Sequence, residues 1–306
     1  RRGNGDLLAQ QSPGARWTRT TSGLAWDREP AWTRDGSAIV FSSDRGGNFG
    51  LWRVRVNADG SGDAPERITN TPEPESAPSV APDGGISFVR GYGAAARVWL
   101  RAADGTEKRL TAGEQAELAP AWSPDGTKLA FVQATETGRR LVVRTIAGSR
   151  DVTVNADRNA ERVSWAPTSD RLAFTAGARG GVFVTSADGR WTNQASTKHG
   201  DLAWSPDGKT LAIAEHDDAA AAYNGDPDRL GDRVASENFV GAERFWLVAA
   251  PSSPDAGLAE QSFVATRDRA GRNADAYDRV WERSARLYFS SADATDRRAQ
   301  WDAAKA

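Results

Sequence analysis

The stretch AWSPDGTKLAFV, residues 121–132, returns almost unchanged as AWSPDGKTLAIA at residues 203–214. Repetition of this kind indicates an architecture in which one structural unit is used several times. Aligned on the motif, the chain contains five copies, which begin at Pro30, Pro78, Pro120, Val163 and Leu202. The residues at the tryptophan position of the motif lie 39 to 48 residues apart, and this spacing is typical of the blades of a β-propeller.

Within one copy, the residues specify a tight turn between two strands. In the third copy Pro124 presets φ for the first turn position, Asp125 can bond the backbone two residues on, and Gly126 accepts a positive φ. The segment after the turn alternates in polarity, so Leu129 and Phe131 share one face of a strand. Each copy therefore predicts a β-hairpin that forms the two inner strands of a blade.

A second pair of strands is predicted after each hairpin, as in LWRVRVNADGSGDAPERIT at residues 51–69. A pair without its hairpin opens the chain at residues 6–20, and the last pair begins at Arg244. Six outer pairs and five hairpins predict an all-β propeller of four-stranded antiparallel blades, with six blades as the simplest count. The missing hairpin would lie upstream of Arg1 or be supplied from elsewhere, and five, seven or eight blades stay open.

The repeated form W-S-P-D-G-x-x-[LI]-A-F, followed by N-A-D-G-S-G and R-[IL]-T, resembles the repeats of the TolB-type propellers of bacterial envelopes. The likeness covers residues 6–248. It implies a periplasmic propeller of six blades that binds other proteins and performs no chemistry. Similar propellers precede catalytic domains in prolyl-oligopeptidase-like and tricorn-like peptidases, so fold likeness alone does not separate these roles. Two copies depart from the pattern, because the second has Val80 for Trp and the fourth, WAPTSDRLAF, lacks the Asp-Gly pair.

Two regions are predicted, a propeller over residues 1–266 and a helical extension over residues 267–306. Residues 214–243 form a long inserted loop within the propeller, and such loops are usually functional or disordered. In the extension, NADAYDRVWERSARLYF has apolar residues at helical spacing. This tail resembles the lead-in of tricorn-like or tail-specific serine peptidases. A helix that packs on the propeller and a link to a catalytic domain beyond residue 306 both stay open.

Composition excludes several classes of function. The chain of 306 residues has a net charge of −2, so we expect no nucleic-acid partner. It has two histidines, no cysteine and no apolar run long enough to span a membrane. No G-x-S-x-G or H-E-x-x-H motif occurs, and we expect no catalytic residue in this chain.

Two weaker motifs are better explained without a ligand. G-x-G-x-x-A at residues 91–96 resembles a dinucleotide fingerprint, but a strand rather than a helix follows, so we expect no cofactor. Residues 57–66 resemble the start of a calcium loop, but the twelfth position is Ile68 rather than Glu. Turn-forming residues account for the same letters, and we therefore expect no metal.

Acidic residues occur three to five positions before each motif tryptophan or its equivalent. Because every innermost strand begins on the same face of a propeller, these acids are predicted around the mouth of the central channel, where they would attract cationic peptides, arginine side chains or a metal ion. The acids are Glu29 (with Asp27 as the alternative), Glu75, Glu117, Glu161 and Asp201. A set of solvated loop acids is the other interpretation.

The inserted loop is predicted to flank the same mouth and to add polar recognition groups. Its candidate binding residues are Tyr223, Asp226, Arg229 and Arg233. The sequence thus predicts a non-enzymatic, exported propeller that binds a protein or peptide at its loop-rich channel face, as a subunit of a larger envelope or membrane-associated assembly. Alternatives are a substrate-gating propeller of a tricorn-like serine peptidase and, third, an enzyme that uses the channel carboxylates as acid and base.

Overall fold

The computed structural model describes residues 6–9, 18–111, 113–155, 159–215, 243–256 and 261–267. The predicted helical extension beyond Arg267 and most of the inserted loop lie outside the described residues, so both stay predictions. Within the described part of the chain, no helix is long and apolar enough to cross a membrane.

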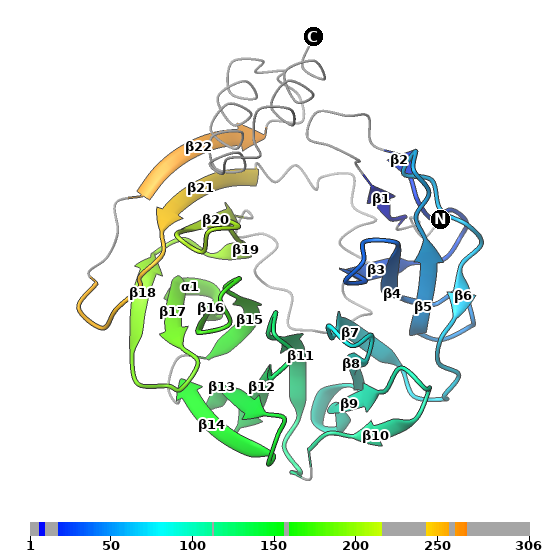
Figure 1. Ribbon diagram of the computed structural model, residues 1–306, viewed down its shortest axis with the longest axis horizontal. Helices are drawn as coiled ribbons and strands as arrows, with labels where there is room; N and C mark the ends of the chain where they lie inside the picture. The colour runs from blue at the N-terminus through cyan, green and yellow to red at the C-terminus, as the bar shows by residue number, and fades with distance from the viewer. Residues whose placement is uncertain are drawn as a thin grey trace. The chain divides into compact units, whose positions relative to one another are not determined.

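The described residues form five four-stranded antiparallel sheets, here called blades A to E, in which each strand pairs with the next along the chain (Figure 1). Blade A contains β3 (Asp27–Trp32), β4 (Ala38–Ser43), β5 (Gly50–Arg55) and β6 (Glu66–Arg67). Blade B contains β7 (Glu75–Val80), β8 (Ile86–Arg90), β9 (Arg97–Arg101) and β10 (Glu107–Arg109), with the short η1 (Gly93–Ala95) before β9. Blade C contains β11 (Glu117–Trp122), β12 (Lys128–Thr135), β13 (Gly138–Thr145) and β14 (Arg150–Asn155).

The two remaining blades follow the same plan. Blade D contains β15 (Ala160–Trp165), β16 (Arg171–Ala176), β17 (Val182–Ser186) and β18 (Thr192–Ser196), with the single turn α1 (Gly177–Gly180) between its middle strands. Blade E contains β19 (Gly200–Trp204), β20 (Thr210–Glu215), β21 (Glu243–Ala249) and β22 (Gln261–Arg267).

The all-β propeller fold and its four-stranded blades are confirmed, but the count of six blades is wrong for the described residues. The outer pair at the start of the chain is present as β1 (Leu8–Ala9) and β2 (Thr18–Arg19), which form a two-stranded sheet with no inner hairpin. Counting outer pairs therefore overstated the number of complete blades by one.

The chain divides into two compact units, and each is described separately. The first comprises residues 1–11 and 16–157, and the second comprises residues 12–15 and 158–306. Blades A, B and C belong to the first unit, and blades D and E belong to the second.

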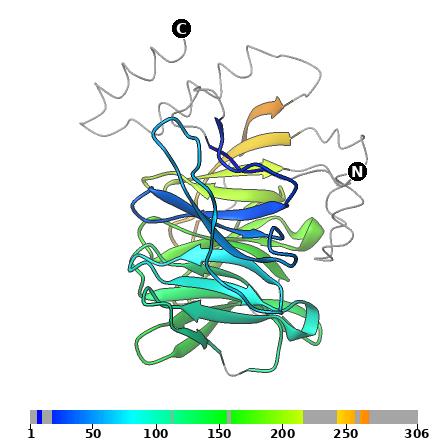
Figure 2. The same ribbon diagram turned by 90° about the vertical axis from the view of Figure 1, so that its right-hand side faces the viewer.

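Neighbouring blades of the first unit bury each other's apolar faces. Val40 and Leu51 of blade A form one buried cluster with Ile86 and Phe88 of blade B. In Figure 2 the blue strands of blade A and the cyan strands of blade B lie in successive layers. A second cluster joins Val98 of blade B to blade C. The repeat thus builds its core between sheets, as the hydrophobic alternation predicts.

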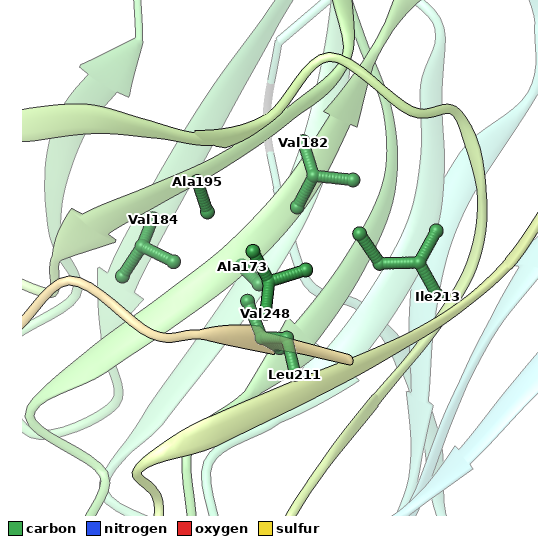
Figure 3. Packing of buried hydrophobic residues seen from close by; sticks show 7 residues of the cluster. All are labelled: Ala173, Val182, Val184, Ala195, Leu211, Ile213 and Val248. Atoms are coloured by element: carbon green, nitrogen blue, oxygen red, sulfur yellow. The ribbon is translucent and has the colours of Figure 1, made fainter. Parts of the chain in front are cut away.

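The second unit has the same kind of core. Its buried cluster, shown in Figure 3, consists of Ala173, Val182, Val184 and Ala195 from blade D and Leu211, Ile213 and Val248 from blade E. Each of these seven side chains is no more than 1% exposed. Both units therefore depend on burial between adjacent sheets.

The turns of successive inner hairpins also contact each other. A Cβ atom added to Gly126 of blade C would lie 3.1 Å from Cδ of Pro82 in blade B. In the second unit, a Cβ atom on Gly208 would lie 3.7 Å from Cδ of Pro167. Proline of one turn thus packs against glycine of the next, so the P-D-G motif serves contacts between blades as well as its own turn.

The fourth copy keeps the turn without the Asp-Gly pair. Ser169 takes the glycine position with φ of 60°, close to the 71° of Gly126 and the 68° of Gly208. Its N–H donates to the carbonyl of Ala166 at 3.0 Å, as the N–H of Gly126 does to Ser123 at 2.9 Å. The turn geometry therefore survives the sequence change, with a non-glycine residue in a left-handed conformation.

Replacing Gly126 with alanine should destabilise the protein more than replacing Gly36. Both glycines have a positive φ, of 71° and 68°, so both substitutions force alanine into a left-handed conformation at a cost of about 1–2 kcal/mol. Gly36 has no atom within 4 Å of the added Cβ, whereas Gly126 faces Pro82. We expect G126A to lose roughly 1 kcal/mol more in urea unfolding. Equal losses would contradict the proposed contact between the turns.

The turn aspartates should make stability depend on acid pH. Hydrogen bonds from the Thr33 and Ser37 side chains, then from the Ser37 N–H, lower the pKa of Asp35 from 3.8 to about 2. At Asp125, burial raises the pKa, but hydrogen bonds from Ser123 and Thr127 outweigh it and the pKa is lowered. A carboxyl with a lowered folded pKa stabilises the fold above its unfolded pKa and loses that contribution as pH falls through the folded value.

We therefore expect D35N to lower the urea midpoint at pH 7, and the difference from wild type to shrink as pH falls from about 4 to about 2. E73Q is the matched control, because Glu73 is exposed. It should leave the midpoint unchanged at each pH. A D35N deficit that persists at pH 2 would show that the charge of Asp35 is not the cause.

Candidate functional site

The predicted acids occupy three different positions at the start of the innermost strands. Glu75 and Glu117 are the first residues of β7 and β11, opposite Arg90 and Gln133 of the adjacent strand. By the same register Asp27, opposite Ser43, is their equivalent in blade A. Glu29 lies two residues further along β3, and Glu161 and Asp201 are the second residues of β15 and β19. Ala160 and Gly200 take the first position in blades D and E.

Glu75 is a buried link between blades A and B. Its side chain is fully buried, and Oε2 accepts a hydrogen bond from the Thr69 hydroxyl at the end of blade A. Oε1 accepts hydrogen bonds from Thr71 at 3.1 Å and from Nε of Arg90 at 2.8 Å. Burial lowers the pKa of Arg90, but its hydrogen bonds to Glu107 and Glu75 outweigh this and the pKa is raised. The guanidinium therefore stays charged and holds Glu75 inside the junction.

Glu117 forms the equivalent link between blades B and C, but without an arginine partner. Oε2 accepts hydrogen bonds from the Thr111 hydroxyl and, at 3.2 Å, from the N–H of Val98. Gln133 replaces the arginine, and Oε1 is buried without a hydrogen-bond partner among the described residues. In blade A, Asp27 binds Arg45 through both carboxylate oxygens at 2.7 and 2.6 Å. These buried carboxylates stabilise the blade starts, and Glu75 and Glu117 do not reach the surface in this conformation.

Glu29 lies at the surface of the first unit, where its side chain is 43% exposed. Oε2 accepts a hydrogen bond of 2.7 Å from the N–H of Ala77, the equivalent residue of blade B. Glu29, Ala77 and Ala119 have φ of 54°, 49° and 49°, and each sits where the pairing of the two inner strands shifts register. Three blades therefore carry the same strained β-bulge at this end of the innermost strand.

In the second unit, the predicted acids are close to basic side chains. Glu161 Oε2 lies 3.3 Å from Nε2 of His199, and Asp201 forms an ion pair with Arg162. The side chains of Glu161 and Asp201 are 30% and 55% exposed. These four residues lie at or just before the starts of β15 and β19, so the structure brings both predicted acids into one mixed-charge surface cluster. Tyr223, Asp226, Arg229 and Arg233 lie outside the described residues, and their role stays a prediction.

A groove that was not predicted from the sequence lies between blades A and B, at the end away from the bulged strand starts. It has a volume of about 750 Å³ and lies beside the turns that join the inner strands. Arg34, Arg53, Arg55 and Arg101 are among its lining residues. One signal was visible in the sequence, because Arg34 stands where the second, third, fourth and fifth copies have proline.

Comparison with known proteins places this architecture among known folds. No protein-family model matches the chain. The uncharacterized protein Atu1656 of Agrobacterium fabrum (strain C58) is 33% identical over 129 residues, which cover 38% of this chain and 43% of the relative. The chain thus matches less than half the length of that relative.

Solved TolB structures share the fold at low sequence identity. TolB from Acinetobacter baumannii superposes with a TM-score of 0.58 at 14% identity, over 81% of this chain and 59% of that one. A putative TolB from Agrobacterium tumefaciens gives a TM-score of 0.57 at 14% identity, over 83% of this chain and 86% of that one. With the four-stranded blades described above, these likenesses show that the chain has the fold of a TolB-like β-propeller.

Proposed function

We propose that this chain is a non-catalytic binding propeller that takes a protein or peptide partner at the starts of the innermost strands of blades A to C. We further propose that it is exported to the periplasm and works there as a subunit of a larger envelope assembly. The resemblance of the repeats to those of TolB-type propellers is the reason for proposing export. A likeness of fold alone does not imply a binding function. The binding role rests on an observation of its own.

That observation is the strained bulge repeated at Glu29, Ala77 and Ala119. A left-handed conformation costs a non-glycine residue about 1–3 kcal/mol, so an unstrained strand would be the more stable solution at each position. Each bulged residue precedes a proline, whose lack of an N–H suits a break in the ladder. Bulges redirect side chains out of a sheet, and strain of this kind concentrates at binding sites. Its retention in three blades supports a binding surface here.

The charge at these strand starts indicates the chemistry of the partner. In the first unit, Glu29 presents a carboxylate whose side chain is 43% exposed beside the bulge. Exposed carboxylates attract basic side chains and steer their approach more than they add to affinity. We therefore propose a partner segment with arginine or lysine side chains.

Rigid blades would limit the entropic cost of binding such a segment. The start of each innermost strand is held by the hydrogen-bonded ladder and, in blades A to C, by the buried carboxylates Asp27, Glu75 and Glu117. Contact groups on a rigid scaffold lose little conformational freedom on association. The buried links thus support binding without touching the partner.

A photo-crosslinking amino acid at position 29 should capture the partner. We expect one discrete cross-linked product when the full chain is incubated with an envelope extract of the producing organism at low salt. Its yield should fall several-fold at 0.5 M salt, because exposed charges are screened. Mass spectrometry then identifies the captured segment, which should be rich in basic residues.

The same group at position 104 is the matched control, because Asp104 is exposed in the turn between β9 and β10, away from the bulges. It should give no product. Excess unlabelled wild-type chain should compete with capture at position 29, and E29K should compete poorly. Equal capture at both positions, or competition that E29K does not weaken, would exclude this face as the binding surface.

A further inference from the structure

The groove between blades A and B has the size and lining of a ligand site. Its volume of about 750 Å³ falls within the roughly 300–1,000 Å³ of pockets that hold drug-sized ligands. Val40, Ile68, Val80 and Ile86 contribute apolar groups from the facing sheets, and they belong to or pack on the core cluster of the two blades. The groove therefore has an apolar floor that continues the core.

The groove is open because the contact between successive turns is absent here. Pro82 and Pro167 each pack against the glycine of the next turn. Blade A has Arg34 in place of that proline, and a Cβ atom on Gly84 would meet only Ala103 of its own blade, at 4.0 Å. Nη1 of Arg34 donates a hydrogen bond of 3.4 Å to the carbonyl oxygen of Pro124 in blade C, so the arginine side chain is directed past Gly84. Of the floor residues, Ile68 and Val80 are half-buried and can be contacted from the groove, whereas Val40 and Ile86 are buried beneath them.

Three of the five arginines that line the groove, Arg34, Arg55 and Arg67, form no ion pair among the described residues. Arg53 forms an ion pair of 2.7 Å with Glu66, whose pKa is lowered by the hydrogen bond from Arg53 and by its charge. Arg101 is paired with Glu107 at 3.0 Å. Within the described part of the chain, no ion pair involves Arg34 or Arg55. Nε of Arg67 donates to the carbonyl oxygen of Thr69 at 2.7 Å, and the charge of Arg55 adds to the lowering of the Glu66 pKa. Arg34, with its one hydrogen bond to Pro124, and Arg55 still have N–H donors that no described residue uses.

Besides Glu66, the groove is lined by Asp35, Asp63 and Asp83, and each accepts a hydrogen bond from a residue close to it in the sequence; Asp63 accepts one from Asn57 at 3.1 Å. Asp35 accepts hydrogen bonds from Thr33 at 2.6 Å and from the Ser37 side chain at 2.7 Å. Asp83 accepts one from the N–H of Gly85 at 2.9 Å. These local hydrogen bonds occupy the three acids, and among the described residues none of them forms an ion pair with an arginine of the groove.

We propose that this groove binds an acidic peptide segment, in which an apolar side chain rests on the floor and carboxylates on either side pair with Arg34 and Arg55. Guanidinium groups pair with carboxylates through two parallel hydrogen bonds, which adds specificity to charge attraction. The apolar floor distinguishes the segment from a bare anion. The groove lies at the turn end of blades A and B, so this site is separate from the bulged strand starts and does not depend on the function proposed for them.

Fluorescence anisotropy with labelled peptides tests the proposal on the full chain. The probe is the hexapeptide Glu-Leu-Glu-Leu-Glu-Leu, with Gln-Leu and Lys-Leu versions for comparison. We expect the acidic peptide to bind at least tenfold more tightly than either of the others at 50 mM salt. R55Q should weaken its binding about tenfold, because one charge-assisted pair is lost.

R34P is the sharper variant, because it restores the proline present in the other turns. It should weaken binding of the acidic peptide at least tenfold without lowering the melting temperature, since the fold already accepts proline at this position in the second to fifth copies. R150Q, at an exposed arginine of blade C, is the matched control for net charge and should bind like wild type.

Several results would overturn the proposal. They are equal affinity for the acidic and neutral peptides, unchanged affinity in folded R34P and R55Q, or no binding at 1 mM protein. Displacement of the acidic peptide by inorganic phosphate, at an ionic strength where sodium chloride does not displace it, would indicate a site for a bare anion. Tighter binding of trigalacturonate than of the peptide would indicate an acidic saccharide instead.

Discussion

Each sheet of this protein has two faces to bury and can cover neither alone, so every other feature depends on the packing of one blade on the next. The repeat meets this constraint with the phenylalanine that follows the P-D-G turn. It is at most 1% exposed in four blades, as Phe41, Phe88, Phe131 and Phe174. Burial of each such side chain contributes about 1.5–3 kcal/mol. Polar links then fix the register of the packed sheets, with a threonine at the end of one blade bonded to the first glutamate of the next, as in Thr69 with Glu75 and Thr111 with Glu117.

The sequence predicted the parts of the fold that are local. A turn written as S-P-D-G and an alternating strand after it specify a hairpin with little help from the rest of the chain, and the fourth copy keeps the turn because Ser169 tolerates the left-handed conformation. The number of complete blades is not local in this sense. It depended on whether each outer pair has an inner hairpin, and the pair β1 and β2 has none among the described residues.

The candidate site was harder to predict because a β-bulge adds a residue that the letters do not show. Counting back from the motif tryptophan reaches the first strand residue after five positions in blade C, at Glu117, but after four in blade E, at Gly200, where the pairing has no register shift. A window of three to five positions therefore combined buried acids with exposed ones. The arginine groove was missed for a different reason. Arg34 was visible as a departure from proline, but the space it leaves depends on a contact between two blades.

The two ends of the blades thus differ in what they offer to a partner. The strand starts combine strained backbone with an exposed carboxylate, and the turn end of blades A and B combines an apolar floor with unpaired arginines. Both features are local departures from an otherwise regular repeat. A regular repeat can therefore supply stability while individual copies carry recognition, because a change in one turn or bulge leaves the neighbouring interfaces intact.

The junction between blades B and C has fewer polar contacts than the junction between blades A and B. Glu117 keeps its buried place although Gln133 has replaced the arginine that Glu75 has in blade B, and one carboxylate oxygen is left without a donor. A buried acceptor without a partner costs about 1–3 kcal/mol, and more when it is charged. A segment of a folded protein that makes fewer stabilising contacts opens locally at a smaller free-energy cost. The Glu117 side chain accepts hydrogen bonds from two groups where the Glu75 side chain accepts them from three, so successive seams of a regular repeat differ in how firmly their polar links hold them.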